Sequence, residues 1–484
     1  MSFNSLAFLI FLPIVILIYW IIPFKFRKYF LLLASYFCYG YFSFWLLLLM
    51  IGISSTSYFS ALLLSKESIS KRKKQVIFVS TITIILSILF IFKYLDFVYS
   101  NICNLINIFG TELEVTSLNI ILPIGISFYT FQTLSYVIDV YKGNYEVEKD
   151  FIYYSLFVSF FPQLVAGPIE RPSNLLPQLK EDKKFNCSFF INGSRQLIIG
   201  FTKKIVVADV LAIFVDAIYQ DLNSASGLLI LLASMLFYFQ IFADFSGYSD
   251  IAKGSAALLG INLSENFKEP YKATSIKDFW RRWHITLTSW LTDYIYIPLG
   301  GNRNRSFRKY LNIFVVFLVS GIWHGANRTF ILWGALNGLL LILYNVLAPL
   351  ISKNSTNNKK YRLLFKVLST CFTFILMSFL WIIFRAQTIQ DVGIAFSRIF
   401  TSFIYGTGYD LFKDVYLITF IVLSIILLLN IKKLPKLYDK SKAENQEKLS
   451  VNVLLYLSLI FLIGLTWIYL LETKGESGFI YFQF

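Results

Sequence analysis

The chain has 484 residues, of which 57% are hydrophobic and 15% are charged, whereas soluble domains contain roughly 45–50% apolar and about 25% charged residues. This composition argues against an ordinary soluble protein. The formal net charge is +16, but nucleic-acid binding is disfavoured because the basic residues lie in loops between apolar runs and form no separate basic face with a recognition motif.

Long apolar runs recur along the chain, and many approach or reach the ~20 residues that cross the hydrocarbon core of a bilayer. This pattern predicts an all-α polytopic membrane protein with about 10–12 membrane segments. No basic residues precede the first run and no small-residue cleavage site follows it, so we expect it to remain as a membrane helix. The runs lie at residues 8–22, 29–50, 76–92, 228–242, 310–322, 330–350, 367–384, 415–431 and 451–471.

The loops between these runs alternate in charge. Those at residues 25–28, 66–74, 353–366 and 432–442 are basic, whereas other connections are acidic or nearly neutral. Cytoplasmic loops of membrane proteins carry an excess of Lys and Arg, so we expect the basic loops to be cytoplasmic. There they also meet anionic lipid headgroups. We expect both termini on the opposite side.

Residues 161–179, FPQLVAGPIERPSNLLPQL, combine several prolines with a glycine inside a stretch that begins as an apolar run. Irregular backbone of this kind cannot face lipid and has to be buried in protein or line a wet cavity. We therefore predict a re-entrant element that enters from the cytoplasmic side.

Ionisable residues within membrane segments are costly and usually functional. Asp244 lies deep in one such segment, at residues 237–254. It either belongs to a substrate-binding site or makes a structural hydrogen bond to a neighbouring helix. Asp250 and Arg385 lie near the ends of their runs, where contact with headgroups explains them.

Residues 265–309 are basic and rich in Trp and Tyr, a combination that is typical of segments in the membrane interface. Within them, residues 275–294 have the pattern of one helix, and Ser275 with Asp278 has the spacing of a capping box. His284 would share the apolar face of this helix with Trp280, Leu287 and Leu291.

The chain contains two histidines, and the second, His324, lies in the apolar motif SGIWHGAN at residues 320–327. The structural alternative is a neutral imidazole that is satisfied by a backbone carbonyl or a hydroxyl. Gly321 and Gly325, however, allow close approach of backbone or substrate, and Asn327 is spaced to orient the ring.

An imidazole with a pKa near 6.5 suits the removal of a proton from a hydroxyl at neutral pH, so we interpret His324 as a general base. A metal pair of His284 and His324 is disfavoured because no carboxylate or thiolate lies at ligand spacing. The four cysteines are scattered without a zinc pattern. We expect no metal site.

These motifs, in this order, resemble the membrane-bound O-acyltransferase superfamily, in particular its branch of alginate O-acetylation proteins. The resemblance covers nearly the whole chain. Its specific part is the pair WRRWH and GIWHGAN, while Arg328 departs from the aromatic or apolar residue expected after GIWHGAN. The supporting motifs are LPIGISFYTFQTLSYVIDVY, FFPQLVAGPIERP, FADFSGYSDIAKGSAALLGINLSENFKEPY and IYIPLGGNR.

The resemblance implies a single domain over residues 1–484, in which tilted helices form a ring around a central tunnel. It implies that His324 is the membrane-embedded catalytic histidine and that His284 is the second family histidine, on the cytoplasmic side of the same funnel. The protein would lie in the bacterial cytoplasmic membrane. An acyl thioester, expected to be acetyl-CoA, would serve as donor substrate, with no bound cofactor.

The acetyl group would then pass outward to a cell-surface or exported polysaccharide, often through a partner acetyltransferase of the periplasm or cell surface. Arg281 and Arg282, with Lys277 and the Arg303/Arg305 loop, are placed to meet donor phosphates, although headgroup contact is the alternative. Trp323 and Asn327 would shape the tunnel around the base.

Three alternatives stay open at the level of sequence. D-alanyl transfer to teichoic acid would use a carrier-protein thioester. A polysaccharide or lipid exporter would need neither histidine, and the same holds for a non-catalytic membrane scaffold. Alginate, a cellulose-like exopolysaccharide, peptidoglycan or another surface glycan all fit as acceptor.

Overall fold

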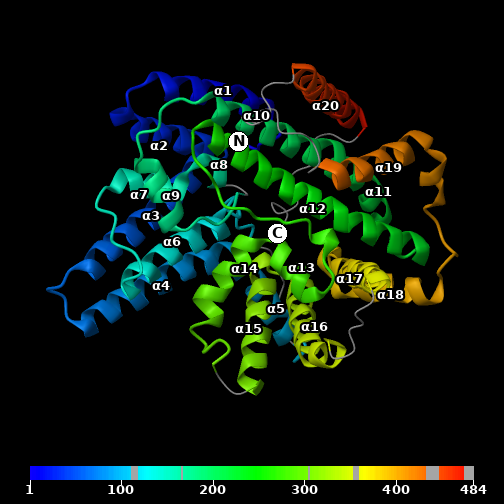
Figure 1. Ribbon diagram of the computed structural model, residues 1–484. Helices are drawn as coiled ribbons and strands as arrows, with labels where there is room; N and C mark the ends of the chain where they lie inside the picture. Colours follow the sequence, from blue (N-terminus) through cyan, green and yellow to red (C-terminus); the bar gives the residue numbers. More distant parts are fainter. Residues whose placement is uncertain (111–117, 165–166, 304–305, 353–358, 432–445, 474–484) are drawn as a thin grey trace. The chain divides into compact units, whose positions relative to one another are not determined.

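The computed structural model describes residues 1–110, 118–164, 167–303, 306–352, 359–431 and 446–473. Within these ranges every extended regular element is a helix, and the sole bridge between extended residues is an isolated one from Ala225 to Thr407. The predicted all-α class is therefore confirmed for the described part of the chain (Figure 1).

The described residues divide into two compact units, each with its own internal contacts. The first contains residues 1–197 and 248–264, and the second contains residues 198–247 with the described parts of 265–436 and 444–484. Two helices, α10 (Cys187–Phe201) and α12 (Gly227–Leu258), contribute residues to both units. The expectation of a single domain stays a prediction.

In the first unit, the helices α3, α4 and α6 pack against one another, and α2 packs against α7. The apolar run at residues 29–50 is divided between α2 and α3 by a turn at residues 41–43. The helices are α1 (Leu6–Ile21), α2 (Phe24–Gly40), α3 (Phe44–Ser65), α4 (Lys71–Lys93), α5 (Leu95–Asn107), α6 (Ile126–Lys142), α7 (Phe151–Ser159), α8 (Phe161–Leu164) and α9 (Pro172–Lys180).

In the second unit, α15 packs along α16 and α16 along α17, while the short helix α13 contacts α14, α16 and α17 (Figure 1). The helices are η1 (Thr202–Ala208), α11 (Asp209–Gln220), η2 (Pro270–Lys272), α13 (Ile276–Arg282), α14 (Ile285–Leu291), η3 (Thr292–Tyr296), α15 (Ser306–His324), α16 (Arg328–Ser352), α17 (Lys359–Arg385), α18 (Ile389–Thr401), η4 (Tyr409–Lys413), α19 (Val415–Asn430) and α20 (Gln446–Thr473).

Six of the described helices are long and apolar enough to cross a membrane. These six helices establish a multi-pass membrane protein. The expected 10–12 membrane segments, the ring of tilted helices and the central tunnel stay predictions. Shorter apolar helices occur at Leu6–Ile21, Phe151–Leu164 and Val415–Asn430. The six segments are Phe44–Ser65, Lys71–Lys93, Gly227–Leu258, Arg328–Pro349, Tyr361–Arg385 and Val453–Leu470.

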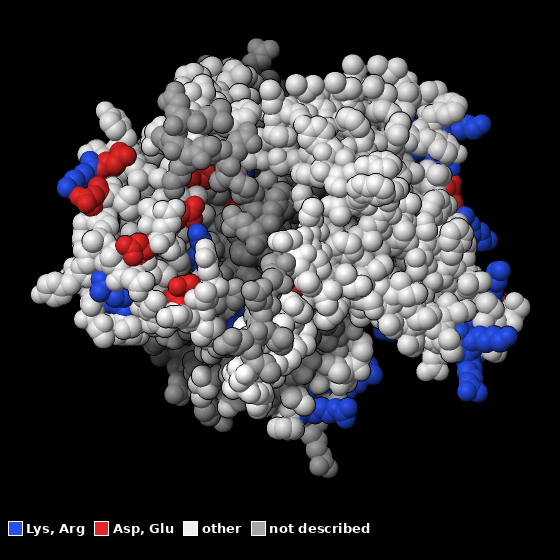
Figure 2. Space-filling model, turned by 180° about the vertical axis from the view of Figure 1, so that it is seen from behind, with Lys and Arg blue, Asp and Glu red and all other residues white. Residues whose placement is uncertain are grey.

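Large apolar side chains remain exposed on these helices, among them Trp45, Leu339 and Phe372. On the face drawn in Figure 2, charged side chains occur in a few separate clusters and most of the surface is uncharged. In a membrane protein such surface faces lipid tails, which are as apolar as leucine, so it needs no protein cover.

The proline-rich stretch at residues 161–179 is interrupted, as predicted. Helix α8 ends at Leu164, and α9 begins with a proline, Pro172, whose fixed backbone suits the first helical position. The buried carboxylate of Glu170 accepts hydrogen bonds from Ser264 and Asn174. The described backbone is thus largely buried in protein, while entry from the cytoplasmic side stays a prediction.

Candidate functional site

The helix predicted over residues 275–294 is wrong as one element, because it breaks at His284. Helix α13 ends at Arg282 and α14 begins at Ile285. His284 between them has left-handed backbone angles, φ 42° and ψ 56°, which are uncommon for a residue with a side chain. The Ser275 hydroxyl accepts a hydrogen bond from the Asp278 N–H at 3.1 Å, which confirms half of the predicted capping box. The Asp278 carboxylate accepts the N–H of Thr274 at 3.1 Å in place of that of Ser275, so the reciprocal half of the box does not form.

Asn266 holds the break in place. The main-chain N–H of Ile285 donates to the Asn266 carbonyl at 3.0 Å. The Thr286 hydroxyl donates to Asn266 Oδ1 at 2.9 Å, and His284 Nδ1 lies 3.1 Å from the same oxygen. Left-handed backbone at a non-glycine residue costs about 1–3 kcal/mol and persists where surrounding contacts enforce it, often at functional sites.

The imidazole of His284 is buried among aromatic rings. Its centroid lies 4.7 Å from that of Phe245, 6.5 Å from that of Phe267 and 5.9 Å from that of Trp323. Burial lowers the pKa of His284 to about 3, because desolvation disfavours the charged imidazolium. The ring is therefore neutral at physiological pH.

His324 is the last residue of α15, where the chain turns into α16. The two helices approach closely because Gly321 faces Gly334, and a Cβ atom on Gly321 would lie 2.3 Å from the Phe330 carbonyl oxygen. A Cβ atom on Gly325 would lie 2.4 Å from the Phe330 ring. Close approach of backbone or substrate was expected at Gly321 and Gly325, and at both glycines the approaching atoms belong to the protein.

Aromatic rings also surround His324. The centroid of its imidazole lies 5.0 Å from that of Trp323, 5.2 Å from that of Trp333 and 5.3 Å from that of Phe384. His324 and its three neighbours are all buried. Trp323 contacts both imidazoles, so it connects the two histidines.

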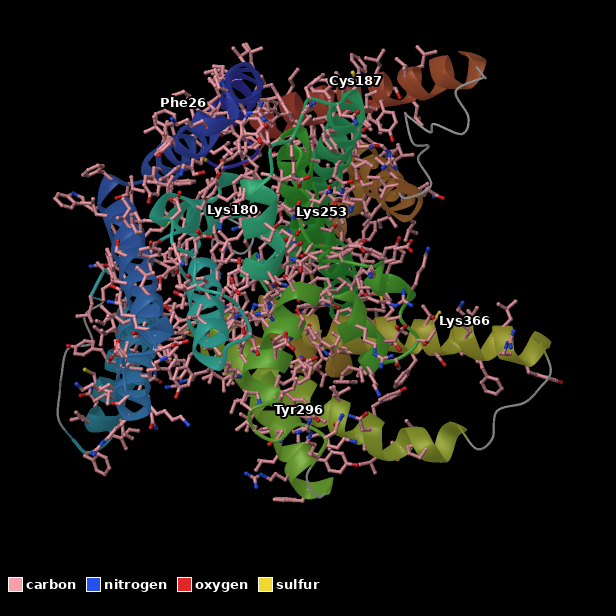
Figure 3. All side chains as sticks on the ribbon, turned by 60° about the vertical axis from the view of Figure 1, so that its left-hand side comes forward. Phe26, Lys180, Cys187, Lys253, Tyr296 and Lys366 are labelled. Atoms are coloured by element: carbon pink, nitrogen blue, oxygen red, sulfur yellow. The ribbon has the colours of Figure 1, made fainter. Side chains whose placement is uncertain are left out.

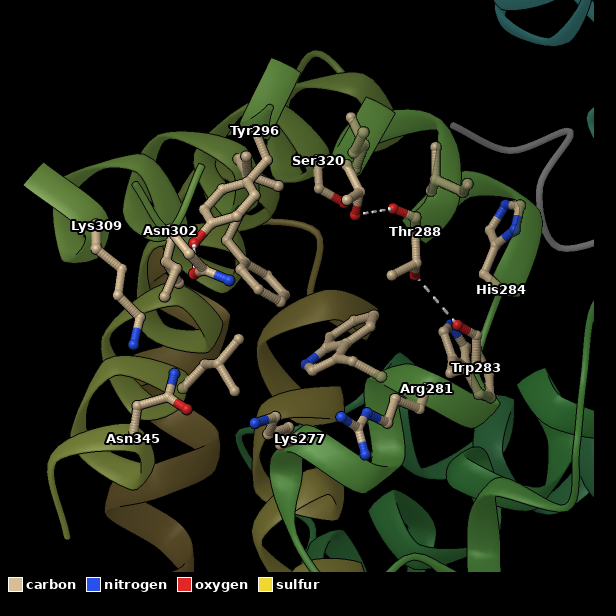
Figure 4. Close-up of a pocket in the computed structure, with 18 of the residues that line it drawn as sticks. Lys277, Arg281, Trp283, His284, Thr288, Tyr296, Asn302, Lys309, Ser320 and Asn345 are labelled. Carbon is tan, nitrogen blue, oxygen red and sulfur yellow. Dashed lines mark hydrogen bonds between the residues drawn. The ribbon is translucent and has the colours of Figure 1, made fainter. Parts of the chain in front are cut away.

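A cavity of about 520 Å³ is lined by both histidines. Trp280, Leu287 and Leu291, which the sequence pattern places on one face with His284, also line this cavity, although the helix that carries them is broken. In Figure 4, His284 lies at one side of the cavity, and Lys309 and Asn345 lie at the other.

Three cations line the same cavity: Lys277 and Arg281 from α13 and Lys309 from α15 (Figure 4). Asn302 and Asn345 lie near Lys309, and Tyr296, at the end of η3 (Figure 3), donates a hydrogen bond to Asn302 Oδ1 at 2.7 Å. This side of the cavity is therefore polar and positively charged, which suits an anionic group on a substrate.

Other residues predicted for the site lie elsewhere. Arg282 pairs with Asp278 at 2.9 Å and does not line the cavity. Arg303 is also absent from the lining, and Arg305 lies outside the described residues. Asp244 pairs with Lys204 at 2.8 Å, with both side chains about 1% exposed, and does not line the cavity. This placement favours the structural alternative for Asp244.

Asn327 does not orient His324 as expected. Its Oδ1 accepts the Thr329 N–H at 3.1 Å and its Nδ2 donates to the Gln387 carbonyl at 2.7 Å. The side chain therefore caps α16 and joins it to the connection between α17 and α18. Within the described residues, no group of three or more His, Cys, Asp or Glu side chains is arranged to hold a metal ion.

Sequence reasoning missed four residues of this region. Lys309 and Asn345 line the cavity from α15 and α16, and the ring of Trp333 meets that of His324 edge-on. Asn266 lies in the motif FADFSGYSDIAKGSAALLGINLSENFKEPY, which supports the family resemblance. Its place in this motif was the one sequence signal that could have indicated a role for Asn266. No local spacing connects these residues to a histidine.

Comparison with known proteins identifies the family. Its sequence model, for the membrane-bound O-acyltransferase family, matches residues 147–384, which contain the whole cavity. A probable alginate O-acetylase, AlgI, of Pseudomonas aeruginosa is 36% identical over 408 residues, covering 84% of this chain and 76% of that protein. The chain belongs to the membrane-bound O-acyltransferase family. This family member is therefore an O-acyltransferase, and the two histidines lie within its acyltransferase region.

Other relatives of this acyltransferase differ in the activity that they are named for. A peptidoglycan O-acetyltransferase of Helicobacter pylori is 36% identical over 421 residues, covering 80% of this chain and 78% of that protein. A teichoic acid D-alanyltransferase of Bacillus subtilis is 27% identical over 257 residues, covering 50% of this chain and 62% of that protein.

Proposed function

We propose that this O-acyltransferase moves an acetyl group from a cytoplasmic thioester donor to a hydroxyl of a cell-surface or exported polysaccharide. The observation that carries the proposal is the single cavity of about 520 Å³ lined by both histidines and by Lys277, Arg281 and Lys309. It places a candidate base and candidate anion-binding groups around one volume, which suits a donor with phosphates and a reactive thioester.

In the proposed reaction, His324 removes the proton from the acceptor hydroxyl. The oxygen attacks the thioester carbonyl carbon, the C–S bond breaks and an ester forms. The departing thiolate takes the proton from the imidazolium, so His324 returns to its neutral form. General base catalysis of this kind contributes typically about 10²–10⁴ in rate.

The three cations would bind phosphates of acetyl-CoA or of a carrier-bound thioester through charge-assisted hydrogen bonds. Arg282 is left out of this set because it pairs with Asp278. Asp244 is left out because it pairs with buried Lys204. Trp323, in contact with both imidazoles, would exclude water from the reacting groups.

The acetyl group and the glycan acceptor are supported by the relatives at 36% identity, which are named for O-acetylation of alginate and of peptidoglycan. The acceptor hydroxyl would belong to the glycan itself or to a partner acetyltransferase of the periplasm or cell surface. D-alanyl transfer to teichoic acid is the second candidate, supported by the more distant relative named for it.

The test measures acyl esters on the cell surface. Esters released by mild base are compared between cells with the wild-type chain, with His324→Ala and with no chain. Ester-linked acetate that falls equally in the last two supports the proposal. Ester-linked alanine that falls instead supports the second candidate. If no ester changes although the wild-type chain accumulates, the proposal is wrong and an exporter or scaffold is favoured.

We also propose that the protein lies in the bacterial cytoplasmic membrane with its basic loops in the cytoplasm. The test uses variants without the native cysteines, in which Ser68→Cys or Asp410→Cys adds one exposed thiol. A membrane-impermeant maleimide added to intact cells should label the second variant and spare the first. The opposite labelling pattern would reverse the proposed orientation.

A further inference from the structure

The hydrogen-bond pattern around Asn266 fixes which end of its side-chain amide is the oxygen. The main-chain N–H of Thr286 donates to Oδ1 at 3.3 Å, and the Thr286 hydroxyl donates to the same atom at 2.9 Å. A backbone N–H can only donate, so the atom that it contacts has to be an acceptor. The amide is thus oriented by its protein neighbours, independently of the histidine.

This orientation fixes the proton on His284. Its Nδ1 lies 3.1 Å from Asn266 Oδ1, and an oxygen acceptor requires Nδ1 to carry the hydrogen. In a neutral imidazole the other nitrogen then keeps its lone pair. Nε2 of His284 is buried and has no hydrogen-bond partner among the residues that the structure describes. A buried acceptor without a partner costs about 1–3 kcal/mol, which a bound hydrogen-bond donor would recover.

We propose that Asn266 is a positioning residue that holds His284 in the Nδ1–H tautomer, so that Nε2 accepts a hydrogen bond from an O–H or N–H group of a substrate. His284 thereby orients substrate and does not carry the transferred proton. The tautomer is independent of the proposed acetyl transfer, whereas the substrate role rests on that function.

The surroundings of the ring support a neutral acceptor. The rings packed against it, those of Phe245, Phe267 and Trp323, do not titrate. Asp244, beside Phe245 on α12, is paired with Lys204. The charged groups that share the cavity with His284 are Lys277, Arg281 and Lys309, which disfavour a further positive charge. The lowered pKa of His284 agrees with this arrangement.

The experiment uses nuclear magnetic resonance of the full chain labelled with ¹⁵N-histidine in lipid nanodiscs. Because the chain has two histidines, a His324→Gln variant leaves the signals of His284 alone. We expect a protonated Nδ1 and an unprotonated Nε2 from neutral pH to about pH 5. In the Asn266→Ala variant, the signature of a fixed Nδ1–H tautomer should be lost.

The matched control is Thr286→Val, which removes a second donor to Asn266 Oδ1 but keeps the bond to His284. It should leave the tautomer unchanged. Asn266→Asp keeps an acceptor for Nδ1–H and should raise the pKa of His284, because a carboxylate favours the imidazolium. This variant also tests the inference if Asn266→Ala does not fold. A protonated Nε2 in the wild-type chain, or an unchanged tautomer in Asn266→Ala, overturns it.

Acyl transfer by the same variants, without the His324 substitution, tests the substrate role. Loss of the hydrogen-bond partner of a metal-bound histidine costs about 10-fold to 100-fold in affinity or activity. We expect a loss of similar size for Asn266→Ala, while Thr286→Val stays near wild type. Full activity of Asn266→Ala with a lost tautomer overturns the substrate role. If the wild-type chain has the expected tautomer but transfers no acyl group, the proposed function fails and the positioning role stands.

Discussion

The two histidines are held by different physical means, although they line one cavity. His324 ends a regular helix, and its position follows from tight packing of α15 on α16 and from three aromatic rings. His284 occupies a break between two short helices, where hydrogen bonds that Asn266 accepts enforce strained backbone. Close helix packing and aromatic rings surround His324, and hydrogen bonds to Asn266 fix the orientation and the tautomer of His284.

This difference suggests different tasks. A proton-transferring base needs a fixed position beside the hydroxyl from which it takes the proton. A hydrogen-bond acceptor needs a fixed tautomer, and the neutral His284 ring with its Nδ1 committed to Asn266 meets that need. Variants that remove one means of support at a time should therefore affect the two histidines separately.

The largest effect is expected from His324→Ala. Removal of a general base should lower acyl transfer by about 10²–10⁴ while the protein still folds and inserts in the membrane. Ester-linked acetate and thermal unfolding of the purified variant measure the two properties. Normal transfer by this variant would show that His324 is not the general base. The proposed difference in task between His324 and His284 would then be wrong.

The second effect is a pH dependence of stability that comes from His284. Its pKa is near 6.5 in an unfolded chain and about 3 in the folded protein. Between these values the unfolded state binds more protons, so lowering the pH destabilises the fold, by up to about 1.4 kcal/mol for each pH unit. Below about pH 3 the loss from this group should end.

The matched variant is His284→Asn, because asparagine tolerates left-handed backbone better than most residues. Its melting temperature should depend less on pH between about 4 and 6.5 than that of the wild-type chain. Equal pH dependence in both proteins would show that His284 is not held neutral by burial.

The third effect concerns the packing that places His324. In Gly321→Ala, the new Cβ atom would lie 2.3 Å from the Phe330 carbonyl oxygen, so α15 and α16 have to separate. We expect a loss of about 1–3 kcal/mol in the free energy of unfolding, which is typical of overpacking. Thermal unfolding and acyl transfer should both decrease.

Gly393→Ala in α18 is the control, because nothing lies within 4 Å of a Cβ atom at that position. Alanine in place of a helical glycine should there stabilise by about 0.5–1 kcal/mol. Similar stability changes in both variants would contradict the role of close helix packing at Gly321.

The smallest effect separates two adjacent arginines. Arg281→Ala should raise the KM for acetyl-CoA by about 10-fold with little change in kcat, because a cation lost from the lining of the cavity weakens binding of donor phosphates. Arg282→Ala removes a partly exposed ion pair with Asp278 and should change KM little. The reverse order of effects would place the donor on the other side of α13.

The sequence predicts the regular parts of this protein well. Apolar runs predict membrane helices because a helix that faces lipid is apolar around most of its surface, and the Ser275 cap follows from a local hydrogen bond. The spacing of Trp280, His284 and Leu287 predicted that they share one face, and all three line one cavity. The same spacing failed to show the break at His284, because periodicity carries no information on backbone strain.

By itself, then, the sequence determined that this is a helical membrane protein of the acyltransferase family with two exceptional histidines. These features can be recognised from composition and short motifs, which involve only residues that are neighbours in the chain. Tertiary structure decided what surrounds each imidazole. It brought Asn266 to His284, Lys309 to the cavity and Lys204 to Asp244. Those outcomes depend on hydrogen bonds, charges and close packing between segments that are not neighbours in the chain, which no local pattern records.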